Sequence, residues 1–260
     1  MATHCCNLPF SMRPRQSHSD LESDMKYFQR SAILTSILLF SAALAPAVAE
    51  QSSGPSTNVA WTIETLNLLR SGDPERGAML NTKLECVTCH GDNGVSTNDT
   101  WPSLSGQTAG YTFKVLRDYR EHKLSGTQRG ELMAYIVAEM SDQDMADIAS
   151  YYAQYTLPPA RIASVQEAAE TLDLLGDPTR LIPPCSVCHG NKGQGSFPDF
   201  PALAGQSPEF LMRSMMDFKA GFRGNDVYSR MRLIAGTLTE EEIESLADYF
   251  AGKGIAVAQE

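Results

Sequence analysis

The 260-residue sequence has no basic stripe and no low-complexity tract, and acidic residues outnumber basic ones. The 31 Asp and Glu against 21 Lys and Arg give a formal net charge of -10. Nucleic-acid-binding proteins concentrate positive charge on one face, and an acidic surface disfavours docking on anionic lipid. We therefore expect no nucleic-acid partner and at most peripheral contact with a membrane. The length suits one large domain or two small ones.

Cysteine is scarce outside two short motifs. The motifs are Cys86-Val-Thr-Cys89-His90 and Cys185-Ser-Val-Cys188-His189, and the remaining cysteines, Cys5 and Cys6, lie close to the start of the sequence. Cys-x-x-Cys-His is the attachment signature of c-type haem, because two thiols about one helical turn apart reach the two vinyl groups of one porphyrin. The histidine that follows then supplies a nitrogen ligand to the iron.

Two other interpretations of Cys-x-x-Cys are a redox dithiol and half of a zinc site. The adjoining histidine weakens the dithiol interpretation, and neither motif has a second ligand pair nearby to complete a zinc site. We therefore predict two covalently bound haem c groups. The proposed thioether residues are Cys86, Cys89, Cys185 and Cys188, and the proposed iron-ligating histidines are His90 and His189.

An export signal precedes both motifs. Lys26 and Arg30 come before an apolar run at 31–45, and Ala47-Val-Ala49 gives a small-x-small cleavage site. The run has about 15 residues, against the about 20 that a membrane-spanning helix needs. We predict that a signal peptide at 1–49 is cleaved and that the mature protein is periplasmic. An uncleaved anchor is the alternative, and the cleavage site argues against it.

The first 24 residues are unusual ahead of such a signal. Met25 is followed at once by Lys26, which makes a conventional start for a signal peptide. We expect translation to begin at Met25 or at Met12, and we treat 1–24 as a spurious extension.

The two motifs belong to an internal repeat. At an offset of 99 residues, Pro102-Ser-Leu-Ser-Gly-Gln107 matches Pro201-Ala-Leu-Ala-Gly-Gln206. The segments 64–69 and 170–175 are also alike, and each leads into Gly-Asp-Pro. The mature chain therefore divides into a first haem domain at 50–157, a linker at 158–167 and a second haem domain at 168–260.

Each half is predicted to be mostly helical. Asp73-Pro74 favours a helix start, and Ser141-Asp-Gln-Asp144 and Thr239-Glu-Glu-Glu242 are capping-box patterns that open the last helix of each half. No convincing pair of alternating strands is found, so the predicted fold class is all-α. Pro183-Pro184 directly precedes the second motif and predicts that any helix ahead of it ends early.

The second axial ligand of each iron is expected to be methionine. Apart from His90 and His189, the mature chain has only His122, which has no counterpart in the second half and fits a surface position better. Met133 and Met231 occupy matching places in the repeat, at an offset of 98 residues because the second half is one residue shorter by this point. Methionine ligation raises the reduction potential of a haem into the electron-transfer range. The methionines assigned instead to core packing are Met140, Met145, Met212, Met215 and Met216.

Pro102 and Pro201 each follow a haem histidine by twelve residues. A prolyl carbonyl has the chemistry to accept the histidine N–H and orient the ring. A simple turn proline explains each position equally well.

Together these motifs resemble the dihaem cytochrome c4 family. The resemblance covers 64–157 and 168–253 and rests on Cys-x-x-Cys-His-Gly, Pro-x-Leu-x-Gly-Gln, an aromatic residue, the lone methionine and Ser/Thr-x-x-Asp/Glu. It implies two tandem class I cytochrome c domains related by a pseudo-twofold, with His/Met ligation and the haems close together at the domain interface. It also implies that the carbonyls of Pro102 and Pro201 accept from the haem histidines.

Three functions are compatible with the sequence. The first is a periplasmic electron carrier, not itself an enzyme, that takes electrons from a bc1-type donor and passes them towards a terminal oxidase. The second is an electron-accepting subunit of a sulfide or sulfur-compound dehydrogenase, because the module also resembles the dihaem subunit of flavocytochrome c sulfide dehydrogenase. The third is a dihaem peroxidase, which two matching methionines disfavour.

Overall fold

The computed structural model describes residues 61–124, 126–161 and 167–254, all of which belong to one compact unit. The predicted signal peptide and the expected start sites lie outside these residues. Within the described ranges no β-strand occurs, and only isolated bridges join Asp177 to Ile182 and Ser196 to Phe200. The all-α prediction is confirmed. None of the helices in this part of the chain is long and apolar enough to cross a membrane.

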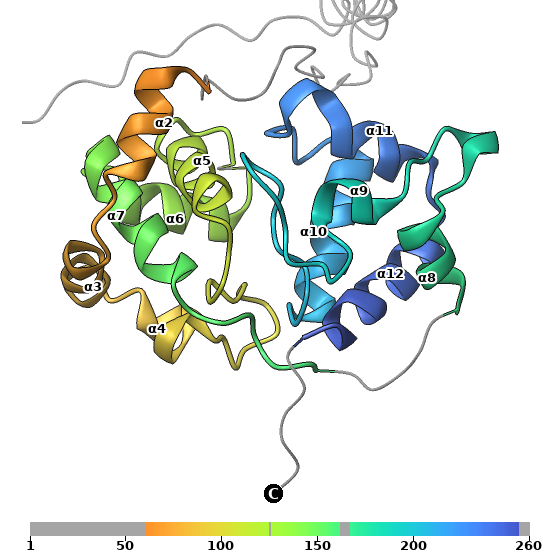
Figure 1. Ribbon diagram of the computed structural model, residues 1–260, viewed down its shortest axis with the longest axis horizontal. Helices are drawn as coiled ribbons and strands as arrows, with labels where there is room; N and C mark the ends of the chain where they lie inside the picture. The colour runs from red at the N-terminus through yellow and green to blue at the C-terminus, as the bar shows by residue number, and fades with distance from the viewer. Residues whose placement is uncertain (1–60, 125, 162–166, 255–260) are drawn as a thin grey trace, which may run out of the picture. The chain divides into compact units, whose positions relative to one another are not determined.

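The helices form two groups, one for each half of the repeat (Figure 1). The first half contains α2 (Ile63–Arg70), α3 (Pro74–Lys83), α4 (Val87–His90), the 3-10 turn η1 (Asp92–Gly94), α5 (Ala109–Arg120), α6 (Gln128–Val137) and α7 (Asp142–Ala153). The second half contains α8 (Glu167–Leu174), η2 (Pro178–Arg180), α9 (Cys185–His189), α10 (Pro208–Ala220), η3 (Val227–Ser229), α11 (Arg230–Thr237) and α12 (Glu240–Gly252).

Each half has its own apolar core, built around its last helix. In the first half α7 packs on α3 and α5, and Phe113, Met145 and Tyr152 are buried there. In the second half α12 packs on α10 and α8, and Ile243 and Phe250 are buried. The position of Met145 agrees with its assignment to core packing.

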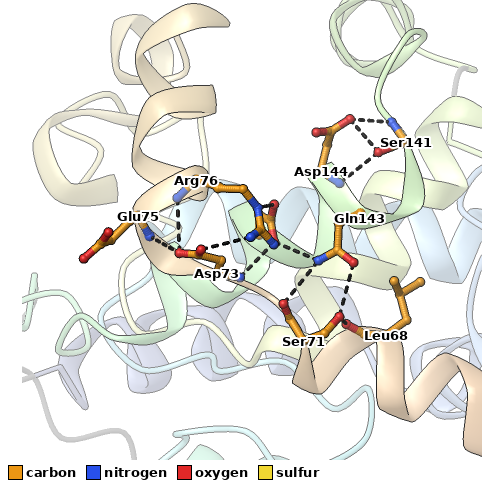
Figure 2. Close-up of polar contacts among 9 residues, drawn as sticks. Leu68, Ser71, Asp73, Glu75, Arg76, Ser141, Gln143 and Asp144 are labelled. Atoms are coloured by element: carbon orange, nitrogen blue, oxygen red, sulfur yellow. Dashed lines mark hydrogen bonds and ion pairs between the residues drawn. The ribbon is translucent and has the colours of Figure 1, made fainter.

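Polar side chains fix the starts of α3 and α7 (Figure 2). The Asp73 carboxylate accepts from the backbone N–H of Glu75 at 2.8 Å, which caps the helix that Pro74 begins. Ser141 and Asp144 form the predicted capping box, and Thr239 and Glu242 form the second one at the start of α12. Both capping-box predictions are confirmed.

The two halves differ just before the haem motif. In the first half Gly-Asp-Pro leads into α3, whereas in the second half it leads only into η2, a single 3-10 turn. Leu181 follows with a φ of 57°, and Pro184 then precedes α9. The expectation that helix ahead of the second motif ends early is confirmed. The first half therefore has a helix, α3, that packs on α7 together with α2, whereas in the second half only η2 stands between α8 and the motif.

Arg161 connects the two halves. Its backbone N–H donates to the carbonyl of Ala251 at 3.0 Å, and its guanidinium donates to the carbonyl of Gly205 at 3.2 Å and to Asp99 at 2.9 Å. Asp99 belongs to the first half, and Gly205 and Ala251 belong to the second. One side chain of the predicted linker thus bonds to both halves.

Candidate haem-binding site

Two short helices, α4 and α9, present the two Cys-x-x-Cys-His motifs. Each helix ends at the histidine, and the next residue is a glycine with positive φ: Gly91 at 75° and Gly190 at 78°. A Cβ on Gly91 would lie 2.0 Å from the carbonyl oxygen of Val95. Only glycine suits this turn, because the backbone conformation is left-handed and the space is filled. The turn ends the helix and directs the following loop back across the histidine.

The two motif histidines make the same hydrogen bond. Nδ1 of His90 lies 2.8 Å from the carbonyl oxygen of Pro102, and Nδ1 of His189 lies 2.9 Å from that of Pro201. A carbonyl oxygen only accepts, so Nδ1 carries the hydrogen and donates it. Nε2 of each ring therefore keeps its lone pair, which is the form that ligates iron.

Equivalent backbone hydrogen bonds hold the two proline loops. The N–H of Leu104 donates to the carbonyl of Gly94 at 2.7 Å, and that of Leu203 donates to Gly193 at 2.8 Å. The glycine two residues later donates to the last helix in each half, Gly106 to Tyr152 and Gly205 to Phe250, both at 3.0 Å. The repeated Pro-x-Leu-x-Gly-Gln sequence thus encodes a loop fixed at both ends, which holds the prolyl carbonyl against the histidine.

Sequence reasoning missed an aromatic residue beside each histidine. The ring centroid of Trp101 lies 6.4 Å from that of His90, and Phe200 lies 6.5 Å from His189, both edge-on. Each aromatic residue directly precedes the repeated proline, so the repeat offset carried a signal for both. They limit the orientations open to the imidazole rings.

One cavity of about 400 Å³ contacts both motifs. His90 and His189 are 6% and 7% exposed and line it together with the four motif cysteines. Met133 on α6 and Met231 on α11 line the same cavity, as do Met140 and Met215, which the sequence assigned to packing. His122 is not part of the lining. The structure therefore brings every proposed ligand to one cavity.

Two glutamines link the halves beside this cavity. Gln107 Nε2 donates to the carbonyl of Ala202 at 3.1 Å, and the N–H of Ala202 donates to Gln107 Oε1 at 2.7 Å. Gln206 bonds to Ser103 in the same two-point manner. Ser103 and Ala202 directly follow Pro102 and Pro201, so each glutamine holds the proline loop of the opposite half. The sequence contained both glutamines in the repeated motif but gave no sign of their partners.

The protonation chemistry of the site fits covalent haem. Burial raises the pKa of the Cys86 thiol, and burial together with the charge of Asp173 raises that of Cys185 to about 12. A reactive dithiol needs a lowered thiol pKa, so the redox-dithiol interpretation is disfavoured. Burial lowers the pKa of both His90 and His189, which favours the neutral, ligating imidazole. Among the described residues no cluster of three or more His, Cys, Asp or Glu is arranged to hold a metal ion.

Comparison with known proteins agrees with this site. A family model described as cytochrome c matches residues 74–155. Cytochrome c4 of Thiocapsa roseopersicina is 32% identical over 70% of this chain and 93% of its own length. The thiosulfate dehydrogenase electron acceptor of Stutzerimonas stutzeri strain A1501 is 35% identical over 66% of this chain and 80% of its own. The crystal structure of reduced recombinant cytochrome c4 from Pseudomonas stutzeri matches with a TM-score of 0.63 and 30% identity, over 70% of this chain and 99% of that one.

The similarity spans nearly the whole length of these cytochromes c4. It agrees with the repeated motifs, the all-helical fold and the paired histidine sites described above. This chain therefore belongs to the cytochrome c4 family and is a dihaem electron-transfer cytochrome with covalently bound haem c.

Proposed function

We propose that this cytochrome is a periplasmic electron carrier with one haem in each of two domains, at 50–157 and 168–260, joined by the linker at 158–167. In this proposal it takes electrons from a bc1-type donor and passes them towards a terminal oxidase. The acidic net charge of -10 supports a freely diffusing protein, because it favours solubility.

Each half is proposed to supply all the attachment points of its own haem. They are Cys86, Cys89, His90 and Met133 in the first half, and Cys185, Cys188, His189 and Met231 in the second. When bound, each haem supplies a one-electron couple at its iron. The prolyl carbonyls of Pro102 and Pro201 fix the histidine rings, and the mainly apolar cavity walls exclude water.

The observation that carries this proposal is the single cavity that reaches both motifs, with Gln107 and Gln206 crossing between the halves beside it. Two sites that share one cavity and fixed polar links are suited to electron exchange within the molecule, without large motion of the chain. A carrier of this kind accepts and releases two electrons one at a time.

Kinetic reduction and reoxidation of the purified holoprotein test the direction of transfer. We expect a bc1-type complex with quinol to reduce both haems rapidly, and oxidase-containing membranes to reoxidise them with oxygen uptake. If the oxidase does not reoxidise the reduced protein while a small control cytochrome is turned over, the oxidase route is wrong.

A second candidate role is that of electron acceptor for a dehydrogenase. It is supported by the relative named as a thiosulfate dehydrogenase electron acceptor, at 35% identity. In that role the chain takes electrons from a sulfur-compound dehydrogenase. Thiosulfate with a purified thiosulfate dehydrogenase would reduce the cytochrome much faster than either component alone. If the dehydrogenase does not reduce the cytochrome while the bc1-type complex reduces it rapidly, the acceptor role is excluded and the carrier role is retained.

The periplasmic location rests on the predicted signal peptide at 1–49. N-terminal sequencing of the holoprotein from a periplasmic fraction should begin at Glu50. Recovery of the protein with residues 26–45 intact in the membrane fraction would contradict cleavage and favour the anchor.

A further inference from the structure

A charged cluster is buried beneath the second haem motif. Asp173 on α8 is 0% exposed, and its Oδ2 accepts from the hydroxyl of Tyr249 at 3.0 Å and from the ammonium of Lys253 on the C-terminal side of α12. None of the described residues donates a hydrogen bond to its other oxygen, Oδ1. The negative charge on Oδ1 is therefore not offset by a hydrogen bond from any of these residues.

Asp173 is also bonded directly to the motif. Its backbone carbonyl accepts from the hydroxyl of Ser186, the residue after Cys185, at 2.8 Å. Sγ of Cys185 lies 3.7 Å from the carbonyl oxygen of Leu172, the residue before Asp173. The end of α8 therefore braces the first turn of α9. The charge of Asp173 also acts on this motif, because after burial it is the main influence that raises the pKa of the Cys185 thiol.

The first half has a comparable brace that is built from other positions of the repeat and carries no charge. Asn81 on α3 accepts from the hydroxyl of Tyr152 on α7 at 2.5 Å, and its backbone carbonyl accepts from the N–H of Cys86 at 3.2 Å. Helix α3 packs on α7, and α8 packs on α12. The amide of Asn81 thus braces the first motif, and the carboxylate of Asp173, paired with Lys253, braces the second.

Lys253 offsets the charge of Asp173 only in part. Its side chain is 19% exposed, against 0% for the Asp173 side chain. Water therefore screens the ammonium more than it screens the carboxylate. In the interior a unit charge acts strongly because the effective dielectric constant is far below that of water. On the pKa of the Cys185 thiol, the charge of Asp173 has a larger influence than the opposing charge of Lys253.

We propose that Asp173 is a positioning residue that lowers the reduction potential of the second haem, and that Asn81 leaves the first haem without this bias. The inference rests on the proposed attachment of a haem at Cys185, Cys188 and His189. The oxidised site carries one more positive charge than the reduced site, so a fixed negative charge favours oxidation. The electron is supplied by a redox partner or, in a titration, by the electrode.

Spectroelectrochemical titration of the holoprotein at fixed pH tests the proposal. We expect D173N to raise the potential of the second couple and leave the first unmoved. The reciprocal variant N81D should lower the first couple and leave the second unmoved. The couples are assigned with M133A and M231A, each of which alters one haem.

The matched control is D147N. Asp147 is also a buried carboxylate, with its side chain 2% exposed and paired with Arg76, but its contacts are to Asp73, Arg76 and Gln143 and not to a haem motif. We expect D147N to move neither couple, although it loses the same kind of ion pair. The double variant D173N/K253M removes both charges and avoids leaving an unpaired ammonium, and its second couple should still rise.

The proposal is overturned if the second couple of D173N is unchanged or falls while haem content and thermal unfolding midpoint stay near those of the parent. It is also overturned if D147N moves the second couple as far, or if N81D leaves the first couple unmoved. Failure of the proposed function would be seen separately, in the unaltered protein. Its measured mass would not include two haems, or its redox titration would show a single couple.

Discussion

The side-chain amide of Gln206 forms two hydrogen bonds with the backbone of Ser103, and these join the two halves of the molecule. Gln206 Nε2 donates to the carbonyl of Ser103 at 2.6 Å, and the N–H of Ser103 donates to Gln206 Oε1 at 2.9 Å. Ser103 directly follows Pro102, the residue whose carbonyl accepts from His90. The ring of the first haem histidine is therefore held by a loop that the second half positions, and Gln107 does the same in the opposite direction.

We predict that Q206L disturbs the first haem more than the second, and that Q107L does the reverse. Each substitution leaves a buried N–H and carbonyl of the opposite loop unpaired, at about 1–3 kcal/mol per group. Chemical unfolding should show this loss of stability. A redox titration of the two couples should show the crossed effect on potential.

Replacement of the exposed Gln154 by leucine is the control and should change neither property. If Q206L shifted mainly the second couple, the proposed route from Gln206 through Ser103 and Pro102 to His90 would be wrong.

Local features of this molecule were predictable because their causes lie within a few residues. Ser141 and Asp144 form their capping box through atoms three residues apart, and Pro183-Pro184 stops a helix by its own geometry. The internal repeat allowed a further prediction. The two copies of Pro-x-Leu-x-Gly-Gln lie at the same distance from the two haem motifs, which indicated that both halves contain the same loop. The family and the two haem c groups followed from these patterns.

Partners distant in sequence were not predictable. The repeat aligns Asp173 with Asn67, but Asn67 is exposed. It is Asn81 on α3 that accepts from a tyrosine hydroxyl of the last helix, as Asp173 does in the second half. The reason is that the first half has an additional helix, α3, between α2 and the motif, and this helix packs on α7 and carries Asn81. A hydrophobic pattern shows which face of a helix is buried but not which helix covers it.

We predict that M133A and M231A each convert one haem of the pair from a low-spin to a high-spin state and lower its potential. Methionine ligation raises the potential, and alanine cannot ligate iron. Absorption spectra and redox titration of each variant measure both changes. M145L is the control, because Met145 is 0% exposed in the first core and does not line the cavity. Retention of low-spin spectra and parental potentials in both alanine variants would refute the ligand assignment.

The buried pair of Lys114 and Asp118 is expected to be sensitive to single substitution. Their side chains are 4% and 1% exposed, with 2.5 Å between Nζ and Oδ2, and Lys114 also donates to the carbonyl of Asn225 in the other half at 2.5 Å. K114M removes the ammonium from a buried carboxylate, which keeps its hydrogen bond from Asn225. The free energy of unfolding should fall by about 3–5 kcal/mol.

Urea unfolding of K114M, D118N and the double variant K114M/D118N measures the coupling of this pair. We expect the double variant to lose less free energy of unfolding than the two single variants together, because it leaves neither charge buried without the other. The partly exposed pair of Arg117 and Glu121 provides the comparison, and E121Q should cost at most about 1 kcal/mol. A loss in K114M no larger than that in E121Q would show that the buried pair contributes little.

The η2 turn should make a defined contribution to acid sensitivity. Hydrogen bonds from Thr179 and Arg180 lower the pKa of Asp177 from its ordinary 3.8 to about 2. A carboxyl whose pKa is lower in the folded state stabilises the fold above its unfolded pKa, and this contribution is lost as the pH falls towards the folded value. The stability difference between the parent and D177N should therefore be constant above about pH 5 and shrink between about pH 4 and pH 2. Urea unfolding of both proteins across this range measures this difference. A difference that stays constant down to pH 2, or grows as the pH falls, would show that the Asp177 hydrogen bonds do not favour the ionised form in solution.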